Sequence, residues 1–270
     1  MKTALITLSA EGARLLSPLT GRLPEARLFI HESVRCKSVQ HDSGREAPEA
    51  ESFSKIADLT ALLFPICREL VYAAPCGVVV RALAPLLKSK FEDPAVVVLD
   101  VGGRWTVSLL SGHEGGANDL AVRVANLTSA EPVVTTTTQA LKSVIVGIGC
   151  RRGMPAERII AAIHEALTKS GVLLEEVRLL ASADIKANEA GLLTAAETLG
   201  VPIRFIAAEA IRSSSREFLH SDFVEKKLNL PAVAEPAALL AGRRTQFICR
   251  KKSYNGITIA LAREGFPWLR

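Results

Sequence analysis

The sequence predicts an α/β protein of two units, each a mostly parallel sheet with helices on both faces. Apolar runs of strand length alternate with amphipathic helical segments along all 270 residues, and that alternation is typical of parallel α/β sheets. A strand, a glycine-rich turn and a helix follow one another twice. The first glycine-rich turn begins after Leu110 and the second after Ile148. The second occurrence opens a new alternating run, so we place the boundary near Ala140, between domains at 1–140 and 141–270.

In the first unit, apolar and β-branched runs predict strands, and apolar residues at helical spacing predict helices. Gly102 and Gly103 form a tight turn between two strands, which predicts a hairpin. The polar stretch Ser38–Glu51 is predicted to be a solvated loop, and Pro75-Cys76-Gly77 a turn. The predicted strands are Thr3–Ser9, Arg27–His31, Glu69–Ala73, Ala95–Asp100, Arg104–Leu110 and Glu131–Thr138; the predicted helices are Glu11–Leu19, Phe53–Arg68, Val78–Leu87 and an apolar helix carrying Leu120 and Leu127.

The second unit repeats the alternation. Pro155 stands where its first helix begins and Gly171 where that helix stops, and Ile159, Ile163 and Leu167 form the buried stripe between them. A helix between two successive strands allows those strands to pair in parallel. The predicted strands are Ser143–Cys150, Val177–Ile185, Ile203–Ala207, Phe247–Arg250 and Ile257–Ala262; the further predicted helices are Asn188–Leu199, Phe218–Leu228 and Pro236–Ala241.

Composition is that of an ordinary globular chain, with 49% hydrophobic and 23% charged residues. The apolar run in Met1–Ser9 is too short for a secretory signal, and no window approaches the about 20 apolar residues of a membrane span. We therefore expect a cytoplasmic protein without membrane contact. The five cysteines are widely spaced and contain no CxxC pair, which predicts reduced thiols and no metal site.

The formal net charge of +5 does not by itself indicate a nucleic-acid partner. The basic residues are scattered among 28 acidic ones, and aromatic residues make up only 5% of the chain. A small anionic substrate explains that balance at least as well. Walker A, GxGxxG, GxSxG and zinc-ligand patterns are absent from the sequence, which argues against the usual nucleotide-binding and serine-hydrolase classes.

The stretch SGHEGGAN is the first candidate site. A glycine-rich turn ahead of a helix N-terminus exposes backbone N–H groups that can hold an oxyanion or a carboxylate. Histidine ordinarily titrates near neutrality, so His113 is the leading candidate for a general base. The alternative is that His113 and Asn118 only cap the helix and satisfy the turn. The candidate catalytic residues are His113, Ser111 and Asn118, and the candidate substrate-binding glycines are Gly112, Gly115 and Gly116.

The turn GCRRG, after the first strand of the second unit, is the second candidate. An arginine beside a helix N-terminus can bind a carboxylate through two hydrogen bonds. Arg151 and Arg152 are therefore either carboxylate ligands or solvated surface residues. Cys150 is a nucleophile only if the pKa of its thiol is depressed, and otherwise it packs. Gly149 belongs to the same turn.

Charged residues after a later strand form the third candidate. Asp184, Lys186 and Glu189 lie where a strand gives way to a helix, the edge at which α/β proteins bind ligands. Asp184 or Lys186 is expected to contact substrate, whereas Glu189 either does the same or only favours its helix N-terminus. Glu235, just ahead of Pro236, is either an acid at a helix start or a site carboxylate.

Five ordered motifs resemble the CbiG family, the cobalt-precorrin-5A hydrolases of anaerobic cobalamin biosynthesis. The motifs are SGHEGGAN followed by PVVTTTT, VGIGCRRG, ADIKANEAGL, VAEPAALLAG and ITIALA, and the resemblance covers Pro75–Asn126 and nearly all of Ser143–Ala262. It implies a cytoplasmic enzyme that opens the ring-A acetate δ-lactone of cobalt-precorrin-5A with water and releases the two-carbon fragment at C20 as acetaldehyde. The cobalt then belongs to the substrate, a tetrapyrrole with acetate and propionate arms, so no cofactor of the protein is implied.

The chain departs from the family pattern at two places. The family usually has a middle region between the threonine-rich strand and the VGIGC strand, whereas only Gln139–Lys142 stands there. Glu114 occupies a position where the family commonly has an apolar residue. The first departure bears on how the macrocycle is covered, and the second on the site itself.

Water attack on the lactone, with His113 as base, is the favoured mechanism, at a crevice shared by the two glycine turns. Three other classes remain open. The second half alone resembles CobE of the aerobic route, which indicates a non-catalytic binding or carrier protein for a corrinoid intermediate. A nucleic-acid-binding protein rests on net charge alone, and a structural partner of a neighbouring methyltransferase is the third. A homodimer and transient contacts with other corrin-pathway enzymes are compatible with the favoured mechanism.

Overall fold

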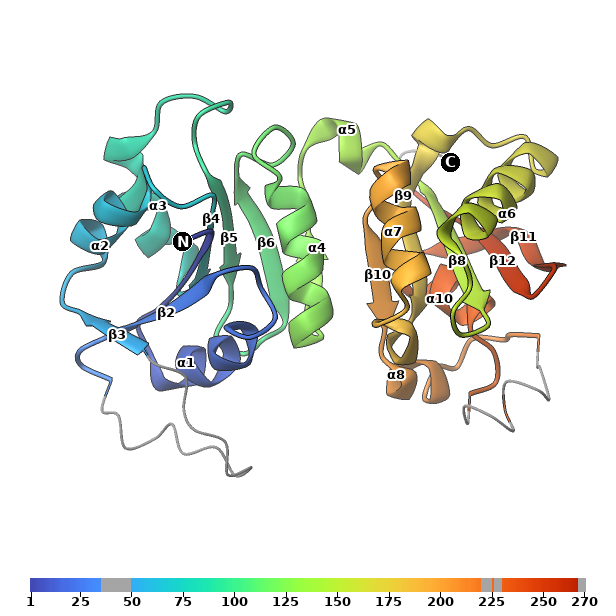
Figure 1. The fold of residues 1–270 in the computed structure, drawn as a ribbon, viewed down its shortest axis with the longest axis horizontal. Coiled ribbons are helices and arrows are strands. Elements are labelled where there is room, and N and C mark those ends of the chain that lie inside the picture. Colours follow the sequence, from blue (N-terminus) through green and yellow to red (C-terminus); the bar gives the residue numbers. More distant parts are fainter. Residues whose placement is uncertain (35–49, 220–224, 226–229, 267–270) are drawn as a thin grey trace. The chain divides into compact units, whose positions relative to one another are not determined.

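The computed structural model describes residues 1–34, 50–219, 225 and 230–266 (Figure 1). The chain divides into two compact units, Met1–Thr136 and Thr137–Arg270. Each unit has its own β-sheet and its own hydrophobic core.

The first unit is built on a seven-stranded sheet with the strand order β3-β2-β1-β4-β5-β6-β7. Strands β1 to β5 are parallel to one another, β6 is antiparallel to β5, and β7 is parallel to β6. The chain order reverses between β1 and β4, as it does in doubly wound α/β sheets. The strands are β1 (Thr3–Thr7), β2 (Ala26–His31), β3 (Ala50–Phe53), β4 (Glu69–Ala73), β5 (Ala95–Leu99), β6 (Trp105–Leu110) and β7 (Glu131–Val133).

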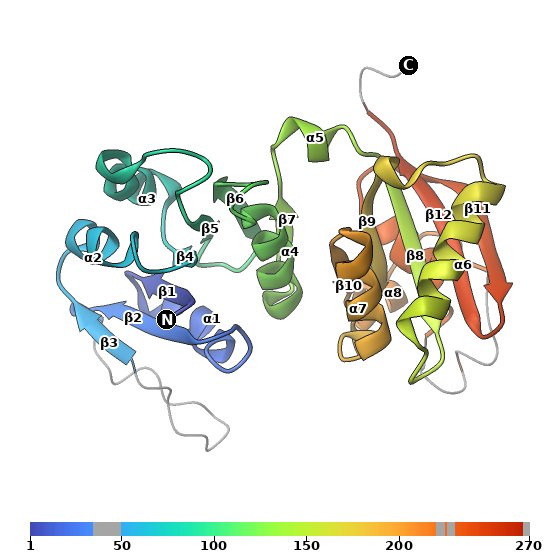
Figure 2. The same ribbon diagram turned by 45° about the horizontal axis from the view of Figure 1, so that its top comes forward.

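Helices cover both faces of this sheet (Figure 2). Leu16 of α1 and Leu120 of α4 share one core cluster with Leu5, and Leu59 of α2 shares another with Ile6. Leu5 and Ile6 are successive residues of β1, so their side chains point to opposite faces. The helices are α1 (Ala10–Leu16), α2 (Ile56–Leu63), α3 (Cys76–Leu83) and α4 (Ala117–Thr128), with short 3₁₀ helices at Ser17–Leu19 and Ala84–Leu86.

The antiparallel step at β6 decides where the first candidate turn lies. β6 runs opposite to β5 and to the strands parallel with it, so its carboxyl end lies at the edge where those strands begin. Leu110, the last residue of β6, pairs with Val96 near the start of β5. The SGHEGGAN turn therefore adjoins the amino end of β5, and the carboxyl ends of β1 and β4 lie at the other edge.

The second unit has a five-stranded sheet with the order β10-β9-β8-β12-β11. β8, β9 and β10 are parallel, and β12 is antiparallel to both β8 and β11. Ile257 pairs with Cys150, so the tip of the β11–β12 hairpin adjoins the carboxyl end of β8. The strands are β8 (Val144–Cys150), β9 (Val177–Ala183), β10 (Ile203–Ile206), β11 (Thr245–Tyr254) and β12 (Ile257–Glu264).

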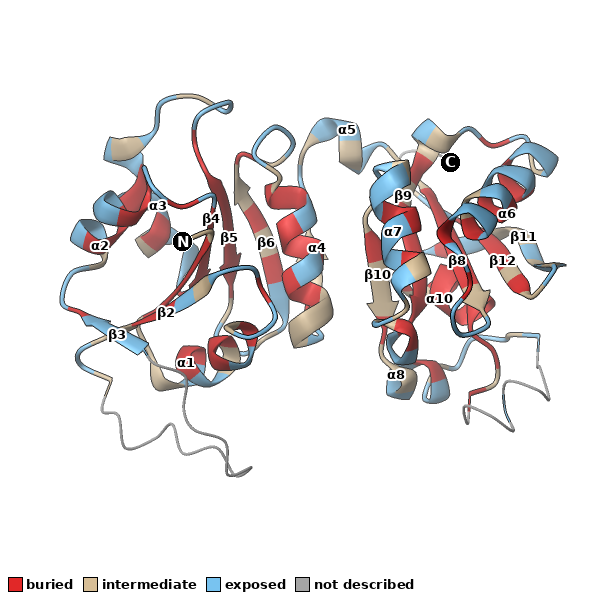
Figure 3. Ribbon diagram, viewed as in Figure 1, coloured by how far each residue is buried: buried red, intermediate tan, exposed pale blue. Residues whose placement is uncertain are grey.

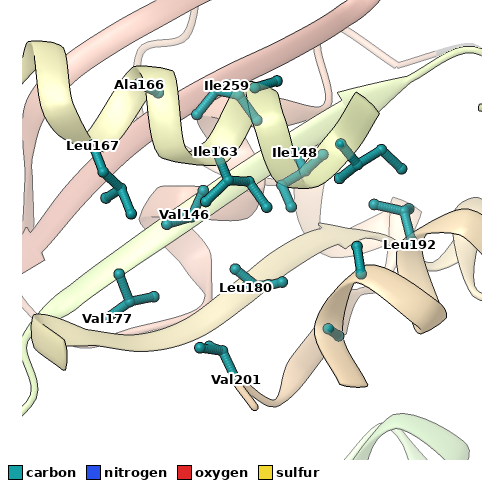
Figure 4. Close-up of a cluster of buried hydrophobic side chains, with 14 of the residues drawn as sticks. Val146, Ile148, Ile163, Ala166, Leu167, Val177, Leu180, Leu192, Val201 and Ile259 are labelled. Atoms are coloured by element: carbon teal, nitrogen blue, oxygen red, sulfur yellow. The ribbon is translucent and has the colours of Figure 1, made fainter. Parts of the chain in front are cut away.

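Helices α6 and α7 cover one face of this sheet, and α10 covers the other. On the first face Ile163 of α6 and Leu192 of α7 share a core cluster with Leu180 (Figure 4). On the other face α10 lies so close to Gly147 that a Cβ there would be 2.0 Å from the Ala234 carbonyl oxygen. The helices are α5 (Thr137–Ala140), α6 (Ala156–Lys169), α7 (Ala190–Leu199), α8 (Ala208–Arg212) and α10 (Ala234–Leu240), with 3₁₀ helices at Leu174–Glu176 and Asp184–Lys186.

Burial follows the pattern that predicted the fold. β1, β4 and β5 are buried along their whole length, and so are the first five residues of β8 (Figure 3). Strands covered by helices on both faces are apolar without alternation, which is the signal that located them in the sequence. The predicted α/β class is confirmed: both sheets are mixed, and seven of the ten strand pairings among the described residues are parallel.

Two predictions in the first unit, one of a loop and one of a strand, are wrong in part. The predicted loop Ser38–Glu51 ends in β3, where Ala50 pairs with β2; residues 38–49 lie outside the described part of the chain. Three of the four β3 residues are exposed, so no alternating apolar pattern marks this strand. The predicted strand Glu131–Thr138 stops at Val133, because the β-branched preference of the threonines is overridden where the chain leaves the sheet.

Helix boundaries also differ from the prediction. Cys76 and Gly77, predicted as part of a turn, are the first residues of α3. β9 ends at Ala183 instead of Ile185, because the next residues form a 3₁₀ helix. The helix predicted over Phe218–Leu228 lies mostly outside the described residues, and its first two residues are not helical.

No helix in the described ranges is both long and apolar enough to cross a membrane.

Candidate functional site

The turn between β6 and α4 folds back on itself. Ser111 takes the left-handed backbone conformation with a φ of 55°, and Gly116 does so with a φ of 84°. The Ala117 N–H donates to the Ser111 carbonyl at 3.2 Å, and the Asn118 N–H donates to the Gly112 carbonyl at 2.9 Å. These bonds hold the turn, and they use two of the α4 amides that the sequence offered to a ligand.

Close contacts require glycine at two positions of the turn. A Cβ at Gly115 would lie 2.4 Å from the Ser111 Cβ, and a Cβ at Gly112 would lie 2.7 Å from the Thr136 Cγ2. Gly116 has open space around it, so its positive φ is what favours glycine there. The glycines predicted to bind substrate are thus also needed to fold the turn.

Ser111 combines two unfavourable features. Only 7% of the residue is exposed, and its hydroxyl has no hydrogen-bond partner among the described residues. A buried hydroxyl without a partner costs about 1–3 kcal/mol, and a non-glycine residue in the left-handed region costs about 1–3 kcal/mol more. Such costs concentrate at functional sites, so Ser111 is the strongest candidate in this unit.

Asn118 holds the turn together. Its Oδ1 accepts a hydrogen bond from the Ser108 hydroxyl at 2.8 Å, and its Nδ2 donates to the Thr136 hydroxyl at 3.0 Å. Both polar atoms of the buried amide are engaged, so Asn118 holds the turn in place. Its predicted part in catalysis stays a prediction. Sequence reasoning missed Ser108 and Thr136; the signals were a serine in an apolar strand and a run of four threonines.

His113, Glu114 and Gly115 form the exposed part of the turn. Glu114 accepts a hydrogen bond of 2.6 Å from Lys90, and this bond lowers the pKa of the Glu114 carboxyl. Lys90 lies on the loop before β5 and was not singled out from the sequence. The exposed imidazole of His113 is accessible to a ligand above the turn, as a general base must be.

In the second unit, the parallel order of β8 and β9 brings two of the predicted groups to one edge. Cys150 is the last residue of β8, and Asp184–Lys186 follows β9 directly. Glu189 is the N-cap of α7, and its carboxylate bonds to the Gly153 amide of the GCRRG turn. The segments VGIGCRRG and ADIKANE therefore meet, because the carboxyl ends of parallel strands share an edge.

Glu189 lies at the centre of this cluster. Its carboxylate accepts from the Gly153 N–H at 3.0 Å and from the Lys186 Nζ at 3.3 Å, and the Arg152 Nε lies 3.9 Å away. Burial by itself would raise the pKa of Glu189, but the Gly153 amide and Lys186 outweigh burial and hold the pKa below its usual range. At neutral pH the cluster therefore contains an ionised carboxylate.

Cys150 is half-buried behind this cluster. Burial raises the pKa of its thiol, and the charge of Glu189 adds to that effect while the charge of Lys186 opposes it. A thiol with a raised pKa is not an activated nucleophile. The structure therefore favours the packing role for Cys150.

The other predicted residues of this edge differ in accessibility. Arg151 and Asp184 are exposed, and the Arg151 N–H donates to the Gly256 carbonyl of the hairpin tip at 3.2 Å. Gly149 faces α10, because a Cβ there would lie 3.5 Å from the Val233 Cβ. That spacing is ordinary van der Waals contact, so no close approach of α10 requires glycine at position 149. Arg151 is accessible to a ligand.

Glu235 lies in the first turn of α10, on the sheet face opposite α6 and α7. Its fully buried carboxylate accepts from the Leu219 N–H at 2.7 Å, from the Lys251 N–H at 3.0 Å and from Arg250 at 3.4 Å. These contacts are those of an acid that joins backbone segments. Within the described part of the chain, no group of three or more His, Cys, Asp or Glu side chains could hold a metal ion.

Comparison with known proteins gives the family of both units. The family described as Cobalamin synthesis G N-terminal matches residues 58–139, and Cobalamin synthesis G C-terminus matches residues 144–262. The chain belongs to the CbiG family. The two CbiG matches leave only residues 140–143 between them, in agreement with the predicted lack of a middle region.

Three proteins show what this CbiG-family chain is similar to. The cobalt-precorrin-5A hydrolase of Salmonella typhimurium is 26% identical over 96% of each chain, in an alignment of 351 positions that exceeds the 270 residues here. The protein CobE of Sinorhizobium is 37% identical over 47% of this chain and 83% of its own. The crystal structure of a cobalamin biosynthesis protein G homolog from Sulfolobus solfataricus is 17% identical, covering 98% of this chain and 97% of that one, with a TM-score of 0.37.

Proposed function

We propose that this chain is a cobalt-precorrin-5A hydrolase, which opens the δ-lactone of its substrate with water and releases acetaldehyde to give cobalt-precorrin-5B. The observation that carries the proposal is the buried, unpartnered hydroxyl of Ser111, in one short turn with the exposed His113. Family membership and similarity over nearly the whole chain to a protein named for this activity support it. Cobalt enters as part of the substrate, so the proposal needs no resident cofactor.

The first step is an acyl transfer to water. Water attacks the lactone carbonyl carbon, the carbonyl oxygen becomes an oxyanion, and the acyl C–O bond then breaks to leave a carboxylic acid and an alcohol. The imidazole of His113 takes a proton from the attacking water and returns it to the departing alkoxide. The Ser111 hydroxyl has no hydrogen-bond partner among the described residues, and in this proposal it donates a hydrogen bond to the oxyanion.

Acetaldehyde leaves in a second step of the retro-aldol type. As a base removes the proton of the new alcohol, the aldehyde C=O bond forms and the C–C bond to the macrocycle at C20 breaks. The electron pair of that bond moves into the macrocycle, which takes up a proton. His113 is again a neutral base after the first step and serves here too. No oxidant or reductant is consumed.

The basic edge of the second unit suits the acetate and propionate arms of this substrate. Arg151 and Arg152 are exposed there, and a guanidinium binds a carboxylate through two parallel hydrogen bonds. In this proposal the two arginines bind peripheral carboxylates of the macrocycle. They take no part in the chemical steps.

Acetaldehyde release tests the proposed reaction. The full chain is supplied with cobalt-precorrin-5A, and acetaldehyde is followed by coupled reduction with alcohol dehydrogenase and NADH. Loss of one oxyanion donor lowers kcat by about 10²–10³-fold, and loss of a general base by about 10²–10⁴-fold. We expect losses of this size in Ser111→Ala and His113→Ala, with little change in KM.

Thr106→Val is the matched control for Ser111→Ala. Thr106 of β6 also has a buried hydroxyl with no partner in the described structure, but it lies in the strand and not in the turn. Its removal should leave kcat unchanged. A wild-type rate in Ser111→Ala or His113→Ala would contradict the role given to that residue, and a wild-type protein that releases no acetaldehyde would contradict the reaction.

A second candidate function is a non-catalytic carrier of a corrinoid intermediate. The observation that favours it is the higher identity to CobE, 37% against 26% for the hydrolase, although the CobE match covers only 47% of this chain. A carrier binds the tetrapyrrole tightly and releases it unchanged. In the same assay, an absorbance change of the bound tetrapyrrole without any acetaldehyde would support the carrier.

A further inference from the structure

Donors from two separate segments form an anion-binding site that Glu189 fills. The Gly153 N–H, the Lys186 Nζ and the Arg152 Nε surround its carboxylate at 3.0, 3.3 and 3.9 Å. Backbone amides, lysines and arginines are also the groups with which proteins bind the carboxylates and phosphates of ligands. The chain thus fills, with its own side chain, a site whose chemistry suits a ligand.

Lys186 explains why Glu189 lies in this site. Only 9% of the residue is exposed, and a buried ammonium without an anion is strongly unfavourable. Glu189 supplies the negative charge that Lys186 needs. A carboxylate from a ligand brings the same charge, so it can take over this role without leaving Lys186 unpaired.

Three features allow the Glu189 side chain to leave the site. Glu189 is the N-cap of α7, yet its side chain makes no capping hydrogen bond to that helix, so its departure costs no cap. The contacts to Lys186 and Arg152 are longer than the about 2.7–2.9 Å of strong charged hydrogen bonds. The Arg152 side chain is 95% exposed, so the site is open to solvent on that side.

We propose that Glu189 is a displaceable internal competitor, and that a carboxylate arm of the substrate replaces it on Lys186, Arg152 and the Gly153 amide. The identity of that substrate rests on the proposed function, whereas the exchange itself applies to any ligand with flexible carboxylate arms. Glu189 therefore weakens the binding of a carboxylate ligand at this site. This role is opposite in sign to that of a substrate-binding residue.

Binding of propane-1,2,3-tricarboxylate to the full chain tests the exchange without any turnover. Amide resonance shifts of the ¹⁵N-labelled protein give Kd. Glu189→Gln keeps an oxygen for the Gly153 N–H and loses the charge, so we expect Kd to fall by about tenfold, within the usual range of coupling between competing groups. Glu165→Gln is the matched control, because it removes the same charge from an exposed ion pair with Lys169 on α6, and it should leave Kd unchanged.

A second pair of variants decides the matter if Glu189→Gln does not fold. Arg152 is exposed, so Arg152→Ala should fold. We expect this variant to raise Kd by about tenfold, because it removes the charged hydrogen bond that Arg152 donates to the ligand carboxylate in this proposal. Arg263→Ala is its control: Arg263 bonds to Glu176 and pairs with Val144 at the far end of β8. The control should leave Kd unchanged.

The exchange would be overturned by an unchanged or higher Kd in folded Glu189→Gln, or by an unchanged Kd in Arg152→Ala. An absence of detectable binding to both the wild type and Glu189→Gln would overturn it as well. Failure of the proposed function gives a different result. In that case the wild type releases no acetaldehyde from cobalt-precorrin-5A, while the gain in tricarboxylate binding by Glu189→Gln remains.

Discussion

Replacing Glu235 should destabilise the second unit and leave ligand binding intact. Its fully buried carboxylate accepts from the Leu219 and Lys251 amides and from the half-exposed Arg250. Glu235→Ala leaves both amides without an acceptor, at about 1–3 kcal/mol each. Because both amides are only partly buried, we expect the free energy of unfolding to fall by about 2–4 kcal/mol. Glu235→Gln keeps one acceptor oxygen and should lose roughly half as much.

Urea denaturation followed by far-ultraviolet circular dichroism measures this loss. With a slope of about 2 kcal/mol/M, the midpoint for Glu235→Ala should fall by about 1–2 M. Glu176→Gln is the control, because Glu176 is 40% exposed in a surface pair with Arg263, and it should change stability by less than about 0.5 kcal/mol. A Glu235→Ala variant as stable as the wild type, but with weaker tricarboxylate binding, would refute this reasoning and make Glu235 a site residue.

Two further predictions concern groups whose pKa the fold raises. Burial, partly opposed by the hydrogen bond to Thr60, raises the pKa of Tyr72 to about 12. In the unfolded chain a tyrosine ionises near pH 10, so only the unfolded state gains from ionisation between about pH 10 and 12. The urea midpoint should therefore stay constant up to about pH 10 and fall as the pH rises towards about 12. Tyr72→Phe should show less of this fall, and an identical pH dependence would contradict the assignment. Burial also raises the pKa of the Cys150 thiol, so iodoacetamide at pH 8 should label Cys150 more slowly than the exposed Cys76. Equal rates by peptide mass spectrometry would show that Cys150 is more accessible and more acidic than the structure indicates.

The candidate site could be located from the sequence but not resolved into roles. Glycine clusters after apolar runs marked both turns, because turns of this kind need residues without a side chain. The roles depend on contacts between distant parts of the chain. Asn118, a predicted donor, is engaged by Ser108 and Thr136, whereas the Ser111 hydroxyl has no partner among the described residues.

The charged cluster of the second unit was likewise located from the sequence, but the pairing within it was not. Arg152, Lys186 and Glu189 were all predicted to lie near substrate, and the structure does bring them to one edge. Local sequence shows that each is charged, but it does not show that Glu189 neutralises Lys186 and occupies the Gly153 amide. That pairing turns a predicted substrate ligand into a predicted competitor.

The sequence by itself determined the α/β class and most of the buried strands. Strands enclosed between helices must be apolar along their length, and helices on a sheet must carry an apolar stripe, so these patterns are local and readable. Only the tertiary structure decided which residues meet at each turn. β6 turns back antiparallel to β5 and carries the first turn to the amino end of that strand, whereas β8 and β9 stay parallel and bring the second turn to Lys186. The Gly102-Gly103 turn predicts the reversal at β6, but the pairing of strands that are distant in sequence is not encoded in any short stretch.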